Sequence, residues 1–305
     1  MLKVEYSKQI NRVVDYILMN LRQPLDLKHL AEIAGLSAYH FHRLFTSELG
    51  ETPAKYIQRR RLEKAAALLQ GDERIPILNV AYDCGFNSAN VFSRNFKKHF
   101  GMTAEEYRCN ISQSNSKNRP SNSNKEEFVR SYSSYFCPRK TIKIGDYKMD
   151  CTFEIKKMPA FNIIYCRHLG AFNEMQDAFA KLMQWAYPRG LINAPGAKLL
   201  SVYHDNPDIT DKSKLTSDAG LIVSEKIKTD GDIGQYEITG GLYAVGRFEI
   251  GMDEFPDAWH AMFDLVKEHG CQCTNAHHYE LYQNNIEEHP QKKWIVDICI
   301  PVKMN

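Results

Sequence analysis

Residues that could do chemistry gather in three places, the first of them around Glu280. In the stretch HHYELYQ, Glu280 alternates with His278 and Tyr282, so a strand would place all three side chains on one face. A carboxylate among aromatic rings suits a pocket for a cationic or polar amphipathic ligand. The same pattern also fits an exposed edge residue, and the spacing does not separate these two interpretations.

The second place holds Cys271 and Cys273, followed by His277 and His278. Neighbouring strand residues point to opposite faces, and no second ligand pair has the spacing of a zinc site. We therefore predict no metal and no cofactor. The sequence also lacks GxxxxGK[ST] and GxSxG motifs and any evident pairing of a nucleophile with a base. These observations predict a protein that is not an enzyme.

The third place is an aromatic and basic group near the amino end, formed by Tyr39, His40, His42 and Arg43. The apolar residues of the same stretch recur at helical spacing and would face inward, which leaves these four side chains outside. Side chains of this kind on an exposed helix suit contacts with the bases and phosphates of DNA.

A helix-turn-helix is the element that would position this third group. Apolar residues from Leu27 to Ala34 predict a short helix, and Gly35 ends it with a left-handed backbone. Ser37 then caps a second helix that begins at Ala38. This is the form of a DNA-binding helix-turn-helix, although a helical hairpin that only packs has the same pattern.

The pattern occurs twice, which favours a DNA-binding function over the packing hairpin. Seven residues match at an offset of 51, namely Ser37, Phe41, Arg43, Phe45, Gly50, Thr52 and Tyr56 with Ser88, Phe92, Arg94, Phe96, Gly101, Thr103 and Tyr107. A connecting helix from Pro53 to about Gln70 is roughly 25 Å long. That length suits two successive major grooves, which lie about 34 Å apart. For Arg59, Arg60 and Arg61 in its middle, we expect a solvated or phosphate-facing role.

Composition fits a protein of two domains. The chain has 305 residues. Residues 1–110 hold 16 Lys and Arg against 12 Asp and Glu, a net +4, whereas the remainder holds 23 against 25, a net −2. No apolar run could span a bilayer, and the amino end lacks the apolar segment of a secretory signal. Because the eight cysteines are scattered, we expect reduced thiols, a cytoplasmic location and no membrane partner.

The sequence predicts three segments. Residues 1–110 form the all-α domain, and residues 111–127, rich in Ser and Asn, form a flexible linker. Residues 128–305 contain β-branched and aromatic runs interrupted by two amphipathic helices, Phe172–Tyr187 and Phe255–His269. The order strand–helix–strand occurs twice, and Tyr203 of the first copy corresponds to Tyr282 of the second. We predict an α+β domain of two related halves, each with a helix on a mostly antiparallel sheet.

Residues 6–108 resemble the DNA-binding domain of AraC/XylS-type transcription regulators. The resemblance is carried by the stretch LAEIAGLSAYHFHRLF and by its repeat NVAYDCGFNSANVFSRNF. The resemblance implies that exposed residues of the third and sixth helices read bases. These residues are Tyr39, His42, Arg43, Ala89, Asn90, Ser93 and Arg94. His40 shares the outer face of its helix, and Lys97 and Lys98 are expected to touch phosphates.

The two helices differ in what they offer to bases. Tyr39 and His42 are poorer hydrogen-bond readers than Arg or Gln, while Ala89 and Val91 offer only apolar contact, for instance to a thymine methyl. We therefore expect the first unit to carry the larger share of specificity.

Residues 148–303, which close with WIVDICIPVK, resemble GyrI-like small-molecule-binding domains. The resemblance implies two strand–helix–strand–strand halves, a ligand cleft at their junction and an acidic residue at the position of Glu280. The candidate aromatic walls are Tyr165, Tyr187, Tyr203, Trp259, Phe263 and Tyr282.

The whole arrangement resembles Rob-type regulators. We predict a sequence-specific DNA-binding transcription regulator, an activator, whose C-terminal domain senses a small molecule. Its expected partners are double-stranded DNA, a small amphipathic or cationic ligand and RNA polymerase. The alternative is a GyrI-like hydrolase of a small electrophile fused to a DNA-binding domain, since some members of that family are hydrolases. A third possibility is a ligand-independent regulator whose second domain docks another protein, such as RNA polymerase.

Overall fold

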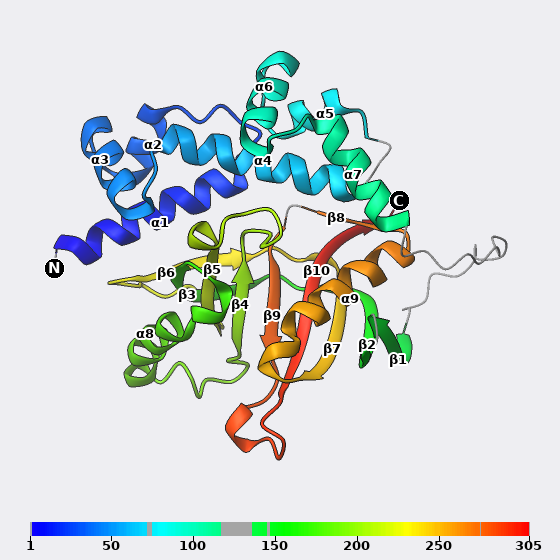
Figure 1. Cartoon of the computed structure of the whole chain (residues 1–305). Helices are drawn as coiled ribbons and strands as arrows, with labels where there is room; N and C mark the ends of the chain where they lie inside the picture. Colours follow the sequence, from blue (N-terminus) through cyan, green and yellow to red (C-terminus); the bar gives the residue numbers. More distant parts are fainter. Residues whose placement is uncertain (1, 72–74, 117–135, 145–146, 275, 305) are drawn as a thin grey trace. The chain divides into compact units, whose positions relative to one another are not determined.

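Two units make up the structure, a computed structural model that describes residues 2–71, 75–116, 136–144, 147–274 and 276–304. The N-terminal unit is helical, and the C-terminal unit combines a sheet with helices (Figure 1). This confirms the predicted fold class, an all-α domain followed by an α+β domain. Within the described residues, no helix has both the length and the apolar character needed to cross a bilayer.

The helices of the N-terminal unit follow the predicted order. They are α1 (Leu2–Met19), α2 (Leu27–Ala34), α3 (Ala38–Leu49), α4 (Pro53–Gly71), α5 (Ile77–Asp83), α6 (Ala89–Phe100) and α7 (Ala104–Ser116). The predicted turn between α2 and α3 is confirmed. Gly35 has φ 70° and caps α2 with its N–H, and the Ser37 hydroxyl accepts a hydrogen bond from the His40 N–H at 3.3 Å.

The internal repeat is confirmed in three dimensions. The second phenylalanine of each repeat packs edge-on against a tyrosine after the next turn: the ring centroids of Phe45 and Tyr56 lie 5.5 Å apart, and those of Phe96 and Tyr107 lie 5.6 Å apart. The repeat is incomplete at Ser88, which precedes α6 but makes no side-chain capping bond. Two residues separate Gly85 from Ser88, whereas one separates Gly35 from Ser37, and this extra residue changes how the chain enters the helix.

Helix α4 is shared by two hydrophobic cores. Tyr56 and Ile57 belong to the core built by α1, α2 and α3, whereas Leu62 and Leu69 belong to the core built by α5, α6 and α7. At ~1.5 Å per residue, α4 is roughly 28 Å long. A helix embedded at both ends is held rigidly, so it fixes the spacing of the two helix-turn-helix units.

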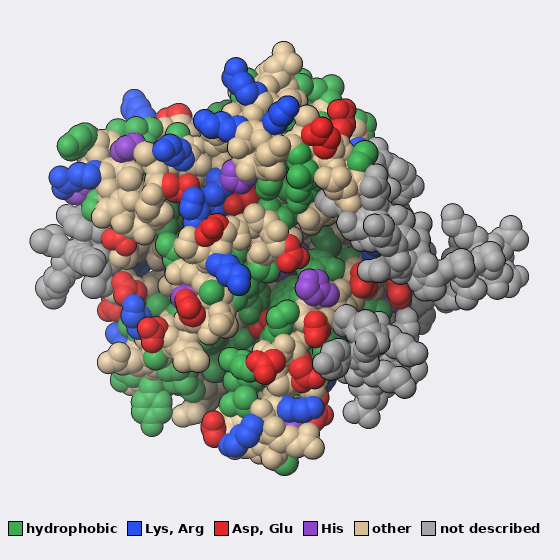
Figure 2. Space-filling model, in the orientation of Figure 1, with side chains coloured by type: hydrophobic (Ala, Val, Ile, Leu, Met, Phe, Trp, Pro, Cys, Tyr) green, Lys and Arg blue, Asp and Glu red, His purple; other side chains and the backbone are tan. Residues whose placement is uncertain are grey.

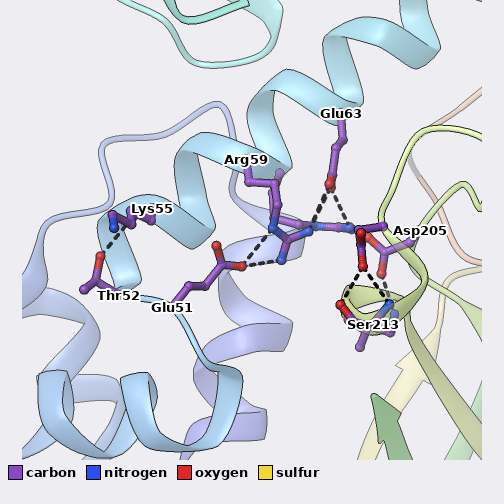
Figure 3. Close-up of polar contacts among 10 residues, drawn as sticks. Glu51, Thr52, Lys55, Arg59, Glu63, Asp205 and Ser213 are labelled. Atoms are coloured by element: carbon purple, nitrogen blue, oxygen red, sulfur yellow. Dashed lines mark hydrogen bonds and ion pairs between the residues drawn. The ribbon is translucent and has the colours of Figure 1, made fainter. Parts of the chain in front are cut away.

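The expectation for the three arginines of α4 was wrong. The side chains of Arg59 and Arg60 are only 8% and 9% exposed, and Arg59 lies between Glu51 at 2.6 Å and Glu63 at 3.0 Å (Figure 3). Arg61 donates to the backbone carbonyls of Leu21 at 2.9 Å and Gln23 at 2.8 Å. These residues therefore hold the unit together and are not placed to face phosphates.

Arg61 also explains Gly85, the glycine in the turn that follows α5. Gly85 has φ 84°, and a Cβ at this position would lie 2.3 Å from the Leu21 carbonyl oxygen and 2.9 Å from Arg61 Nε. A side chain would clash with the backbone and with the guanidinium, so the turn of the second unit requires glycine.

The start of the predicted linker is helical. Helix α7 continues to Ser116, which is six residues beyond Asn110, where the linker was expected to begin. Composition does not mark where a helix ends, because polar residues can continue it for a turn or more. Residues 117–127 of the expected linker and residues 128–135 lie outside the described part of the chain.

The C-terminal unit is built on an antiparallel sheet. Its strands are β1 (Phe136–Ile144), β2 (Tyr147–Met158), β3 (Phe161–Leu169), β4 (Leu199–Tyr203), β5 (Thr216–Val223), β6 (Ile233–Ile238), β7 (Gly241–Ile250), β8 (Cys271–Cys273), β9 (His278–Tyr282) and β10 (Trp294–Met304). They pair in the order β1-β2-β7-β10-β9-β4-β5-β3-β6, with β8 beside β10.

Two related halves meet at the centre of this sheet, as predicted. One half is β3, α8 (Gln176–Ala186), β4 and β5, and the other is β7, α9 (Phe255–Glu268), β9 and β10. The halves join where β4 pairs with β9, with Ser201 opposite Glu280 and Tyr203 opposite His278. Helices α8 and α9 lie on the same face of the sheet (Figure 1), and each packs its apolar side on the strands of its own half.

Candidate nucleic-acid interface and ligand site

Helices α3 and α6 present the predicted DNA-binding side chains. Tyr39 is 79% exposed, and other exposed members of the set are His42, Arg43, Asn90, Ser93, Arg94, Lys97 and Lys98. Positions 39, 42 and 43 share one face of α3 by their helical spacing, and positions 90, 93 and 94 are the equivalents on α6. His40 and Ala89 are only half-exposed, so they lie beside these faces.

An aromatic platform lies behind each of the two faces. Phe41 and Phe45 of α3, like Phe92 and Phe96 of α6, are fully buried, and each pair of ring centroids lies 5.4 Å apart. Such contacts lock the rotation of a helix about its axis. The outer side chains are therefore displayed from a fixed support, as recognition of base edges requires.

Positive charge is displayed along α6. Lys97 and Lys98 are exposed in its last turn, and Figure 2 shows Lys and Arg side chains over α6 at the top of the view. Within the described residues, neither Arg43 nor Arg94 has an ion-pair partner. Cations in the last turn also interact favourably with the helix dipole, so Lys97 and Lys98 contribute to the stability of α6 as well.

Glu280 is the centre of the second site. It is 1% exposed, and its carboxylate accepts hydrogen bonds from Trp259 Nε1 at 2.6 Å and from the hydroxyls of Tyr203 and Tyr282 at 2.8 Å each. Ser201 Oγ lies 2.8 Å from the Tyr282 hydroxyl. The two tyrosines come from equivalent strands of the two halves, so both halves of the domain bind the carboxylate.

Burial sets the protonation of this site. It raises the pKa of Glu280, and the hydrogen bonds from Trp259, Tyr203 and Tyr282 offset part of that rise. Burial beside the Glu280 carboxylate raises the pKa values of Tyr203 and Tyr282 well above their usual range, so both hydroxyls remain donors. Burial also lowers the pKa of His278 to about 4, which leaves its ring neutral near pH 7.

Three of the predicted wall residues surround Glu280, and a fourth lies at the margin. Tyr203, Trp259 and Tyr282 contact the carboxylate and are partly exposed. Phe263, 42% exposed, lies next to Trp259 with ring centroids 5.9 Å apart.

The structure corrects the two remaining wall residues. Tyr165 is fully buried on the sheet face opposite Glu280, where it packs with Val202 and Tyr279. Tyr187 is 72% exposed in the short turn after α8. Strand alternation separates Tyr165 from the site, and α8 ends at Ala186, before Tyr187 could face the sheet.

Sequence reasoning missed further aromatic neighbours of the site. Phe172 lies 4.7 Å from Tyr203, Trp294 lies 4.8 Å from Tyr282 and Phe179 lies 6.2 Å from Tyr282, measured between ring centroids. Trp294 reaches Tyr282 through the register of β10 with β9, whereas Phe172 and Phe179 lie before and within α8 and depend on how that helix packs on the sheet. The spacing of residues supplies neither.

A second repeated feature lies on the opposite face of the sheet. Arg167 contacts Asp218 through Nε at 2.8 Å and Nη2 at 2.9 Å, and Arg247 contacts Asp297 through the same atoms at 2.6 and 2.8 Å. Burial opposes the charge of Asp218, but Arg167 and His204 outweigh it and hold the pKa of Asp218 below its usual range. These pairs tie neighbouring strands together in both halves. The repeat is their signal in the sequence, because Asp218 and Asp297 are 79 residues apart and Arg167 and Arg247 are 80 residues apart.

The cysteine and histidine group is dispersed. Cys271 is buried and Cys273 is exposed, and His277 stacks on Tyr236 with ring centroids 5.0 Å apart. Among the described residues, no group of three or more His, Cys, Asp or Glu side chains is placed to hold a metal ion.

Fold and sites together define a class, namely DNA-binding proteins in which a paired helix-turn-helix unit precedes an α+β domain. A family model described as a helix-turn-helix domain matches residues 30–110, and one described as a GyrI-like small molecule binding domain matches residues 152–303.

Similarity to known proteins places the chain within this class. Regulatory protein SoxS of Salmonella typhimurium is 33% identical over 105 residues, which are 34% of this chain and 97% of SoxS. The uncharacterized HTH-type transcriptional regulator YbfP of Bacillus subtilis is 34% identical over 117 residues, 38% of this chain and 39% of YbfP. A crystal structure of a transcriptional regulator with an AraC-type DNA-binding domain, from Chromobacterium violaceum, is 32% identical with a TM-score of 0.33, covering 34% of this chain and 93% of that one.

Because SoxS is more than 30% identical and matched over nearly its whole length, the chain belongs to the AraC-type family of helix-turn-helix transcription regulators, and its C-terminal unit is a GyrI-like domain. It spans 39% of the length of YbfP.

Proposed function

We propose that the chain regulates transcription by reading an extended DNA site with α3 and α6 while its C-terminal domain binds a small amphipathic cation. The observation that supports the first half is the repeat of two exposed helix faces, each with an arginine at the same position, on one shared helix. In this proposal Arg43 and Arg94 contact bases, and Lys97 and Lys98 contact phosphates. Because it acts on DNA, we place the protein in the cytoplasm.

The buried carboxylate supports a cationic ligand. A carboxylate offers about four acceptor positions, and the contacts of Glu280 use three. One acceptor position thus remains for a ligand among Tyr203, Tyr282 and Trp259, whose rings also attract cations. We propose binding without turnover, since the relatives above are named as regulators. An unchanged mass of the ligand after incubation is the expected result.

Glu280→Gln should weaken binding of decyltriphenylphosphonium, an amphipathic cation, by about tenfold or more. With the native protein the affinity should fall as the pH drops from 8 towards 5. Burial raises the pKa of Glu280 above its ordinary value of 4.5, so its negative charge is lost at a higher pH than for an exposed glutamate. Calorimetric titration across this range measures both effects.

The pH dependence supplies the control for this prediction. His278, with its pKa lowered to about 4, stays neutral over most of this range. Affinity for the cation should therefore not vary with pH in Glu280→Gln. Glu237→Gln, at an exposed carboxylate on β6, should behave like the native protein. A pH profile that survives in Glu280→Gln would remove this residue from the ligand site.

We further propose that the DNA-bound protein activates transcription by contacting RNA polymerase. Leu78 and Tyr82 of α5, 48% and 46% exposed, lie on one face of a helix outside the two proposed reading faces and offer apolar surface for such a contact. In reconstituted transcription with purified polymerase, the native protein should raise transcript yield and Tyr82→Ala should raise it less. A protein that binds the promoter and lowers the yield would refute activation.

A further inference from the structure

Ser217 is a buried hydroxyl on the same sheet face as Glu280. It lies on β5 directly opposite Tyr203 of β4 and His168 of β3. Directly opposed residues of antiparallel strands share a face, and Tyr203 itself donates to Glu280. Ser217 therefore belongs to the row of side chains next to the row that contains Glu280 and Ser201.

The Ser217 hydroxyl is buried and has no hydrogen-bond partner among the residues that the structure describes. The residue has no exposed surface, and its Oγ makes no hydrogen bond to any described residue. Leaving a buried hydroxyl unpaired costs about 1–3 kcal/mol. By contrast, the neighbouring Ser201 hydroxyl is paired with Tyr282. A group that reached Ser217 from within the site would recover this cost.

The sheet fixes the distance between the two polar points. Strand β4 lies between β9, which carries Glu280, and β5, which carries Ser217. Glu280 pairs with Ser201 of β4, and Ser201 pairs with Ala219 of β5. Ser217 is two residues along β5 from Ala219. Two strand spacings and two residues along a strand place their Cα atoms roughly 12 Å apart. Between them lie Tyr203 and, against it, the ring of Phe172.

We propose that Ser217 is a second polar anchor of the ligand site, and that the ligand is an elongated cation with a hydrogen-bonding group remote from its positive charge. This inference rests on the proposed function of Glu280 and extends it. The cation lies at Glu280, an apolar middle lies against Tyr203, and the polar end exchanges a hydrogen bond with Ser217 Oγ.

A matched pair of cations tests this proposal with the full-length protein. Decyltriphenylphosphonium and its 10-hydroxydecyl analogue differ only in a terminal hydroxyl at the end of a chain long enough to span the two anchors. The native protein should bind the hydroxyl analogue roughly two- to tenfold more tightly. Ser217→Ala should abolish that preference and leave the affinity for decyltriphenylphosphonium unchanged. Ser224→Ala, an exposed serine just past β5, should keep the preference.

The outcomes distinguish failure of the Ser217 anchor from failure of the cation site at Glu280. Failure of both cations to bind the native protein would overturn the cationic ligand and the anchor together. Equal binding of the two cations by the native protein would overturn the anchor and leave Glu280 in place. An equal loss of both affinities in Ser217→Ala, or a lowered melting temperature, would show that the hydroxyl serves the fold and would also overturn the anchor.

Discussion

Replacing Arg59 by alanine should lower the free energy of unfolding of the N-terminal unit by about 3 to 5 kcal/mol. The guanidinium lies between Glu51 and Glu63, and all three side chains are at most 10% exposed. The two carboxylates raise the pKa of Arg59 against the cost of its burial. Removing the cation leaves buried negative charge that Arg60, 3.3 Å from Glu63, compensates in part. Because α4 serves both cores, the loss should destabilise both helix-turn-helix units.

The distribution of tryptophan makes this measurement selective. The three tryptophans, Trp185, Trp259 and Trp294, all lie in the C-terminal unit. Urea unfolding followed by tryptophan fluorescence should be unchanged in Arg59→Ala, whereas the helical signal in circular dichroism should be lost at lower urea. Gln58→Ala, on the exposed side of α4, should change stability by less than about 0.5 kcal/mol. Joint replacement of Glu51, Arg59 and Glu63 by apolar residues should restore most of the loss. A native-like midpoint for Arg59→Ala would show that the cluster does not stabilise the unit.

Replacing Arg43 by alanine should weaken binding to the specific DNA site by about 1 to 3 kcal/mol, or roughly 5- to 150-fold, if it forms a bidentate contact with guanine. Arg94 occupies the equivalent position of α6, and its replacement should cost an amount in the same range at a different base. The neighbours of Arg43 are Tyr39 and His42, whereas those of Arg94 are Asn90 and Ser93. We expect the first helix to contribute more specificity, because its side chains reach further.

A charge-preserving variant separates base contact from phosphate contact. Arg43→Lys keeps the positive charge and loses the planar fork that matches guanine. It should lose most of the specific affinity and retain binding to scrambled DNA, as measured by fluorescence anisotropy at fixed salt. Lys97→Ala should weaken specific and scrambled binding equally. Equal losses on the two DNAs for Arg43→Ala would reassign Arg43 to the phosphate backbone.

Local signals predicted the N-terminal unit well. Gly35, Gly50 and Ser37 end or begin helices through interactions within one turn, so their roles follow from sequence spacing. The repeat added independent support, because each core phenylalanine of α3 has a counterpart on α6. Three successive arginines carry no such local signal. Whether Arg59 faces solvent or a buried glutamate depends on α4 being enclosed by two cores, which is a property of the tertiary structure.

For the ligand site too, the sequence predicts local features of a strand but not its tertiary surroundings. Alternation within β9 correctly separated Glu280 and Tyr282 from Tyr279 and Leu281. Alternation within β3 did not reveal which face of that strand the helices cover, so Tyr165 was assigned to the wrong face. Tyr203 and Trp259 are the partners of Glu280 that lie furthest away in sequence. They were predicted because the resemblance to GyrI-like domains implied a ligand cleft at the junction of the two halves.

Selection of bound sequences from random DNA, with the full-length protein, tests the paired reading of DNA most directly. We expect enriched sequences with two conserved segments centred about one helical turn, ~10 base pairs, apart. Arg43→Ala should erase the information in one segment, and Arg94→Ala should erase it in the other. A single conserved segment that both variants weaken alike, or no enrichment above scrambled DNA, would contradict the assignment of α3 and α6 as two reading helices.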